Sequence, residues 1–148
     1  VMIDKKLIGH SFPAVTLTVE EGRLKFFAKT LGETRGIYTS TEVAKKEGLP
    51  GILAPLTFPF LLEIDSMELV DLVNFLGESL EKLLHGEENF KFHKPIYSGD
   101  KITVCKKIFD IIDKKDGALQ FVIFENNFTN QKGLLVAETS TNYVFRHS

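Results

Sequence analysis

Apolar residues recur with helical spacing through the first half of the chain. Counted from Leu24, positions i, i+3, i+4 and i+7 are apolar and predict an amphipathic helix over residues 19–31. Thr18 and Glu21 have the spacing of a capping box at its start. A second, shorter helix is predicted over residues 42–47. The first half of the chain is therefore expected to be mainly helical.

An almost uniformly apolar helix is predicted to begin at Thr57, which can cap it. Pro59 is tolerated in the first turn because the N–H at that position has no helical partner. A helix that is apolar on all sides should be buried. A further amphipathic helix is predicted over residues 67–84, where leucines repeat on one face and acidic residues occupy the other.

Beyond residue 85 the pattern changes to strands. Residues 101–112, 118–128 and 134–145 are rich in alternating and β-branched residues, and turn residues separate them. Three long strands joined by tight turns predict an antiparallel meander. A helical first half followed by strands indicates the α+β class, and 148 residues suit a single domain over residues 1–148.

Residues 121–124 are apolar on both faces of their predicted strand. A sheet surface that faces water alternates between apolar and polar residues, so both faces are expected to be covered. The buried helix near Thr57 would cover one face, and a partner protein would cover the other. A long, curved antiparallel sheet wrapped around one buried helix is the arrangement of the hotdog fold.

Composition and charge exclude several classes of function. The net charge is −2 and the lysines are scattered, so no basic surface for nucleic acid is expected. No apolar segment is long enough for a membrane span or a signal peptide, and a cytoplasmic protein is expected. Cys105 is the only cysteine, and no histidine pair has metal-ligand spacing. We therefore expect neither a metal site nor a cofactor.

Four segments, in chain order, are similar to segments of MaoC-like dehydratases. They are an opening loop (FAKTLGE at 27–33 with GIYT at 36–39), the turn into the central helix (GILAPLTF at 51–58), the first long strand (HGE at 85–87, FKFHKPI at 90–96 and GD at 99–100) and the last hairpin (NQKGLLVA at 130–137). The resemblance extends over about the whole chain and implies the hotdog fold. It is greatest to the N-terminal, fatty-acid-synthase-like dehydratase domain, which often occurs as one of the two subunits of heterodimeric 3-hydroxyacyl-thioester dehydratases.

The resemblance also locates a catalytic pair. Active members carry an Asp and, about five positions later, a His, which act on a water molecule and on the α-proton of an acyl thioester. Here Glu33 stands at the Asp position and Tyr38 at the His position. Tyrosine has an unperturbed pKa of about 10 and cannot replace histidine as a base at neutral pH. We therefore expect a degenerate pair and a non-catalytic subunit that binds the acyl group.

Substrate contacts are expected at the start of the central helix. In the family a backbone N–H there polarises the thioester carbonyl, which implicates Pro55, Leu56, Thr57 and Phe58. Leu56 stands where active members commonly have Gly. His93 is a further candidate for substrate contact, although a structural role at the rim of the site is the more ordinary explanation. The implied ligand is the thioester of coenzyme A or of acyl carrier protein.

The resemblance implies a homodimer, or a heterodimer with a catalytic MaoC-like hotdog subunit. Three alternatives remain open. The chain could be an active (R)-type enoyl-CoA hydratase that uses Glu33 and an unusual base such as His93. It could be an acyl-binding protein without enzymatic activity. A hotdog thioesterase is the weakest alternative, because its usual acid has no counterpart at residues 55–58.

Overall fold

A five-stranded antiparallel sheet forms the body of the molecule, and the α+β class is confirmed. The computed structural model describes residues 2–147, and of His85 only the backbone. The strands lie in the order β1-β3-β4-β5-β2. Their bounds are Val15–Thr18 for β1, Leu83–Phe92 for β2, Lys101–Lys114 for β3, Leu119–Thr129 for β4 and Leu135–Arg146 for β5. The predicted meander of three long strands is confirmed as β3-β4-β5, and the short strand β1 was not predicted.

Five α-helices precede or connect these strands. They are α1 (Glu21–Thr30), α2 (Gly36–Thr39), α3 (Thr41–Lys46), α4 (Phe58–Ser66) and α5 (Leu69–Phe75), with 3₁₀ turns at Lys5–Leu7 and Leu80–Lys82. Ser40 caps α3 by accepting a hydrogen bond from the N–H of Val43. The predicted capping box of α1 is wrong, because Thr18 belongs to β1 and pairs with Lys101. Thr57 stands at the start of α4 without a side-chain hydrogen bond.

The predicted helix over residues 67–84 is also wrong, because α5 ends at Phe75. Gly77 has a φ of +73°, a left-handed conformation that glycine adopts without strain and that ends a helix. Leu83 then begins β2 and pairs with Phe145 of β5. Of the leucines that continued the helical spacing, Leu80 lies exposed in a 3₁₀ turn, and Leu83 packs against the core from a strand.

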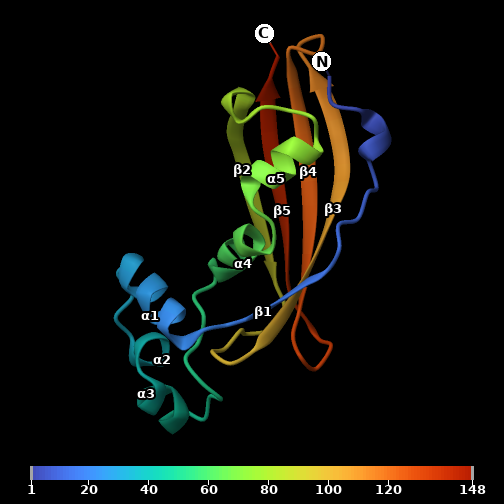
Figure 1. Cartoon of the computed structure of the whole chain (residues 1–148). Coiled ribbons are helices and arrows are strands. Elements are labelled where there is room, and N and C mark those ends of the chain that lie inside the picture. The colour runs from blue at the N-terminus through green and yellow to red at the C-terminus, as the bar shows by residue number, and fades with distance from the viewer. Residues whose placement is uncertain (1, 148) are drawn as a thin grey trace.

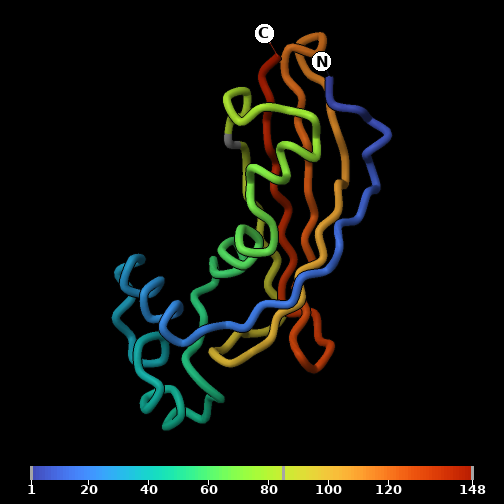
Figure 2. The backbone as a smooth tube through the Cα atoms, in the orientation of Figure 1, coloured from blue at the N-terminus to red at the C-terminus, as the bar shows by residue number. Residues whose placement is uncertain are grey.

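Helices α4 and α5 lie on one face of the curved sheet, while α1 to α3 form a group beyond its end (Figure 1). The N-terminal segment runs beside β3, and the two chain ends lie at the same end of the sheet (Figure 2). The sheet wraps around α4 as predicted, and Phe58 and Leu62 of that helix are buried. Ile64 on its outer side is exposed, so the expectation of a completely buried helix is wrong.

Two apolar clusters make up the core between the helices and the sheet. One lies under α4 and includes Phe58, Leu62 and Phe128, and the other lies under α5 and includes Leu72 and Phe124. On the opposite face of the sheet, Phe121 and Ile123 are only half-buried. Within this chain, therefore, helices cover one face of β4, and the prediction that a partner covers the other remains a prediction.

Candidate functional site

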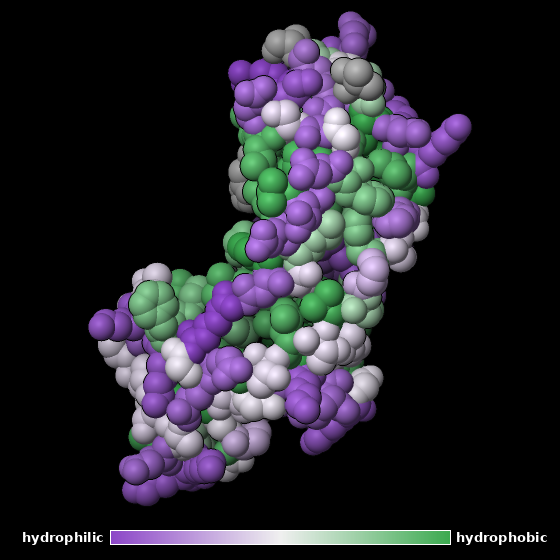
Figure 3. Space-filling view, in the orientation of Figure 1, coloured by the Kyte–Doolittle hydropathy of each residue, from purple (hydrophilic) through white to green (hydrophobic). Residues whose placement is uncertain are grey.

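A pocket of about 280 Å³ lies where the α1–α3 group meets the sheet. Its walls come from Tyr38 of α2, the segment from Leu53 to Leu56, Pro59 in the first turn of α4, the end of β2 with the loop that follows it to Ile96, and the start of β5. In the space-filling view, apolar side chains gather along the middle of this side of the molecule and polar ones cover its ends (Figure 3). Most residues that line the pocket are themselves apolar, and the exceptions are Tyr38, His93 and Lys94.

The segment from Leu53 to Leu56 is fixed from both sides. The N–H of Leu53 donates to the carbonyl of Ile37 at 2.9 Å, and the N–H of Ala54 donates to the carbonyl of Ile96 at 2.8 Å. Just before it, a Cβ on Gly51 would lie 2.5 Å from Oγ of Ser98, so a larger residue would have to displace that side chain. These contacts hold the segment as one wall of the pocket.

The start of α4 presents free backbone donors beside this wall. No described residue accepts a hydrogen bond from the N–H of Leu56 or of Thr57. The first N–H groups of a helix have no helical acceptor, and the helix dipole makes this end partly positive. Leu56 lines the pocket and 65% of it is exposed. An oxygen with partial negative charge, such as a thioester carbonyl, is therefore favoured at this point.

Glu33 does not line the pocket, because Arg35 holds its carboxylate. The guanidinium donates to Glu33 through Nε at 2.7 Å and through Nη2 at 3.0 Å, and the backbone N–H of Arg35 donates at 3.1 Å. The hydrogen bond from the Arg35 side chain is the largest influence on Glu33 and helps to lower its pKa to about 2. Such a carboxylate stays ionised at neutral pH and is a poor proton acceptor.

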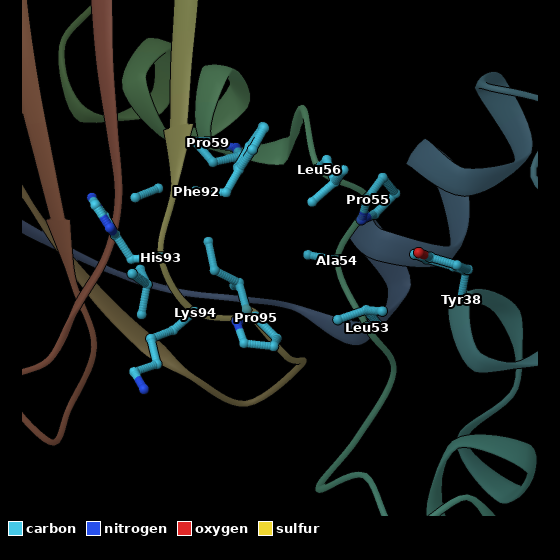
Figure 4. Close-up of a pocket in the computed structure, with 13 residues that line it drawn as sticks. Tyr38, Leu53, Ala54, Pro55, Leu56, Pro59, Phe92, His93, Lys94 and Pro95 are labelled. Atoms are coloured by element: carbon cyan, nitrogen blue, oxygen red, sulfur yellow. The ribbon is translucent and has the colours of Figure 1, made fainter.

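Tyr38 forms one side of the pocket. The guanidinium of Arg35 lies 5.0 Å from the centre of its ring, a cation–π contact. Gly36, at the start of α2, allows the close packing here, since a Cβ would lie 2.6 Å from Cγ1 of Val43. In Figure 4 the segment from Leu53 to Leu56 runs between Tyr38 and the group formed by Phe92, His93 and Pro95.

His93 lines the opposite wall and is tied to β5. Its Nε2 lies 2.7 Å from Oε2 of Glu138, and its backbone N–H donates to the carbonyl of Val136. Both side chains of this pair are about one-third exposed. A histidine that a carboxylate orients beside a pocket has the geometry of a rim contact and also that of a general base.

The two remaining candidates at the helix start do not line the pocket. Thr57 is exposed, and Phe58 is 1% exposed in the core, with its ring centre 6.0 Å from that of Phe27. The apolar walls instead include residues that the sequence did not single out: Phe92, Pro59, Ile96, Val136 and Ala137. Phe92, Val136 and Ala137 lie at paired ends of β2 and β5, Pro59 lies in the first turn of α4, and Ile96 lies in the loop after β2, where its carbonyl accepts from the N–H of Ala54.

Metal-binding clusters and membrane-spanning helices are both absent from residues 2–147. Among the side chains that the structure describes, which leave out that of His85, no group of three His, Cys, Asp or Glu is placed to hold a metal ion. None of the helices in the same range is long and apolar enough to cross a membrane.

Comparison with known proteins identifies relatives of this chain. The family model for the FAS1-like dehydratase domain region matches residues 6–139. A UPF0336 protein of Streptomyces coelicolor is 34% identical over 108 residues, which cover 72% of this chain and 71% of the relative.

Solved structures share the fold. The C-terminally truncated HadBC (3R-hydroxyacyl-ACP dehydratase) complex of Mycobacterium tuberculosis matches with a TM-score of 0.78 at 24% identity, covering 93% of this chain and 96% of that one. The ChsH1–ChsH2 complex of the same organism matches with a TM-score of 0.66 at 15% identity, covering 94% and 98%. Because these identities are low, the structural likenesses establish the hotdog fold alone. The match over residues 6–139 and the identity to the Streptomyces relative show that this chain belongs to the FAS1-like dehydratase family of hotdog proteins.

Proposed function

We propose that this chain binds the acyl group of a thioester and depends on a second hotdog subunit for the residues that add or remove water. One observation carries the proposal. Tyr38 stands at the family's His position, and Arg35 neutralises Glu33, which stands at the Asp position. Neither residue is suited to take up and return a proton at neutral pH.

The pocket supports acyl-thioester binding. Its apolar walls suit an acyl group, and the N–H groups of Leu56 and Thr57 suit the carbonyl oxygen. Water addition places hydroxyl on C3 and a proton on C2 of a trans-2-enoyl thioester, and dehydration reverses both. The role proposed for this chain is to orient the acyl group. Carriers of either kind, coenzyme A or acyl carrier protein, fit this role.

A hotdog partner is proposed from the open edge of the sheet. β2 pairs with β5 on one side only, and natural proteins cover or blunt such an edge. The structural relatives HadBC and ChsH1–ChsH2 are complexes. We propose a dimer in which the second subunit is either a copy of this chain or a catalytic MaoC-like subunit, with the latter supplying Asp and His.

A second candidate function rests on the pair formed by His93 and Glu138. His93 reaches the pocket wall and a carboxylate orients its ring at 2.7 Å, so it is suited to act as a base. This would make the chain an active (R)-type hydratase. Turnover by the chain alone that His93→Ala abolishes would support this candidate. Turnover that persists in His93→Ala would exclude His93 as the base.

Binding of a short acyl-CoA tests the first proposal. We expect isothermal titration calorimetry with the full chain and butanoyl-CoA to show saturable binding. Leu56→Asp should weaken it at least tenfold, because a carboxylate at the helix start repels the carbonyl oxygen. Leu31→Asp is the matched control, since Leu31 is also exposed but does not line the pocket. Absence of binding, or equal effects of the two variants, would contradict the proposal.

A further inference from the structure

Buried polar residues cross the sheet between the two apolar clusters of the core. Lys106, Asn126 and Thr139 are direct neighbours on β3, β4 and β5, and Thr141 faces Glu88 in the next row. Four of these five are at least 95% buried, and Glu88 is half-buried. Together with Glu63 of α4, which lies over them, these residues are called the polar belt.

Glu63 is the centre of the polar belt and is 2% exposed. One carboxylate oxygen accepts a hydrogen bond from the hydroxyl of Thr139 and the other from that of Thr141, both at 2.7 Å. The Thr141 hydroxyl also lies 2.6 Å from Oε1 of Glu88. Hydrogen bonds of this kind stabilise a buried carboxylate, which would otherwise be costly to remove from water.

No residue of the polar belt lines the pocket described above, and Glu63 and Lys106 line a separate one of about 170 Å³. The polar belt instead follows the wall residues of the first pocket along two elements. On β5, Ala137 lines the pocket and Thr139 follows on the same face, about 7 Å further along the strand. On α4, Pro59 lines the pocket and Glu63 follows one turn later, about 6 Å along the axis. Both elements therefore lead from the pocket to the same hydrogen-bonded carboxylate.

We propose that the polar belt closes the inner end of the pocket, so that this chain binds thioesters of short acyl groups and Glu63 sets the length limit. This inference rests on the proposed function. An extended polypeptide advances about 3.6 Å per residue, or about 1.2 Å for each of its three backbone bonds. We use the same advance for each single bond of an extended acyl chain. The 6 to 7 Å that separates the wall residues Pro59 and Ala137 from the polar belt along their elements corresponds to about five or six bonds.

Two opposing free energies decide the limit. Each methylene buried in the pocket tightens binding about fourfold, from about 0.8 kcal/mol per CH₂. A methylene that reaches Glu63 must displace the hydroxyl of Thr139 or Thr141 from the buried carboxylate. The loss of that hydrogen bond costs more free energy than burial of the methylene provides. The amide of Asn126 and Oε2 of Glu88 are buried and already lack partners among the described residues, and an alkyl chain could not supply any.

A series of acyl-CoA thioesters tests the limit on the unmodified chain. Calorimetry from butanoyl- to hexadecanoyl-CoA should show the Kd falling about fourfold per methylene up to about hexanoyl, and no further gain beyond octanoyl. Affinity that keeps rising to dodecanoyl or longer would overturn the length limit and leave the proposed function intact. Absence of binding at every length would contradict the proposed function itself.

Substitution of Glu63 tests whether this residue sets the limit. In Glu63→Leu the carboxylate is gone, so the affinity for decanoyl-CoA should rise at least tenfold while that for butanoyl-CoA stays within twofold. Glu125→Leu is the matched control, because Glu125 lies on the opposite face of the sheet, where it pairs with Lys107. An unchanged length dependence in a folded Glu63→Leu protein would refute the role of Glu63. The series on the unmodified chain decides the length limit even if this variant does not fold.

Discussion

Replacing Glu88 with glutamine should flatten the pH dependence of the chain's stability. Burial, followed by the neighbouring charge of Glu63, raises the pKa of Glu88 from 4.5 to about 8. The folded chain therefore keeps a proton on Glu88 that the unfolded chain releases above pH 4.5. The stabilisation is complete below the unfolded pKa, and it is lost as the pH rises toward 8.

The size of the effect follows from these two pKa values. Between them, stability falls by about 1.4 kcal/mol per pH unit, because only the unfolded chain is ionised. From pH 5 to pH 8 this gives at most about 4 kcal/mol, and water near the half-buried side chain lowers the expected loss to about 3 kcal/mol. For a chain of this length the loss corresponds to a decrease in Tm of about 10 °C.

Thermal unfolding followed by circular dichroism at pH 5, 6.5 and 8 measures this effect. Glu88→Gln should remove the decrease, since glutamine keeps the neutral form at every pH and still reaches the hydroxyl of Thr141. Glu87→Gln is the control, because Glu87 is the exposed neighbour on the same strand. Parallel pH profiles for the unmodified chain and Glu88→Gln would refute this account of Glu88.

Three further predictions concern the pocket and the core. Arg35→Gln should raise the pKa of Glu33 from about 2 toward 4.5, and an unchanged carboxyl titration by NMR would contradict the role of the guanidinium. Phe58→Ala should lower the free energy of unfolding by about 3 to 5 kcal/mol in urea titrations, and a loss below 1 kcal/mol would mean that its site is not tightly packed. Gly36→Ala should destabilise the chain, and Val43→Ala added to it should restore most of the loss, because the new Cβ would lie 2.6 Å from Val43.

Local patterns predicted the sheet and the central helix well. Alternation along β4 and β5 gave strands within two residues of their observed bounds, because one face of each is buried against helices. Pro59 and the apolar run after Thr57 correctly placed the start of α4. In contrast, leucine spacing alone extended α5 past Gly77, since periodicity does not show that Leu83 pairs with a strand distant in sequence.

The sequence predicted only part of the candidate site. The family resemblance pointed to Tyr38, Pro55, Leu56 and His93, and the structure brings these four side chains to one pocket. The polar belt was missed for a physical reason. Glu63 belongs to a helix expected to be almost uniformly apolar and buried, and its partners on β5 can be identified only when the strand register is known.

Assay of the chain alone for hydration of trans-2-butenoyl-CoA tests the central claim most directly. The loss of the conjugated thioester absorbance measures turnover, and circular dichroism on the same sample shows that the protein is folded. The account predicts no turnover by the folded chain alone, and turnover once a MaoC-like subunit carrying Asp and His is added. Turnover by the chain alone that Glu33→Ala or His93→Ala abolishes would contradict the account and make this chain a hydratase in its own right.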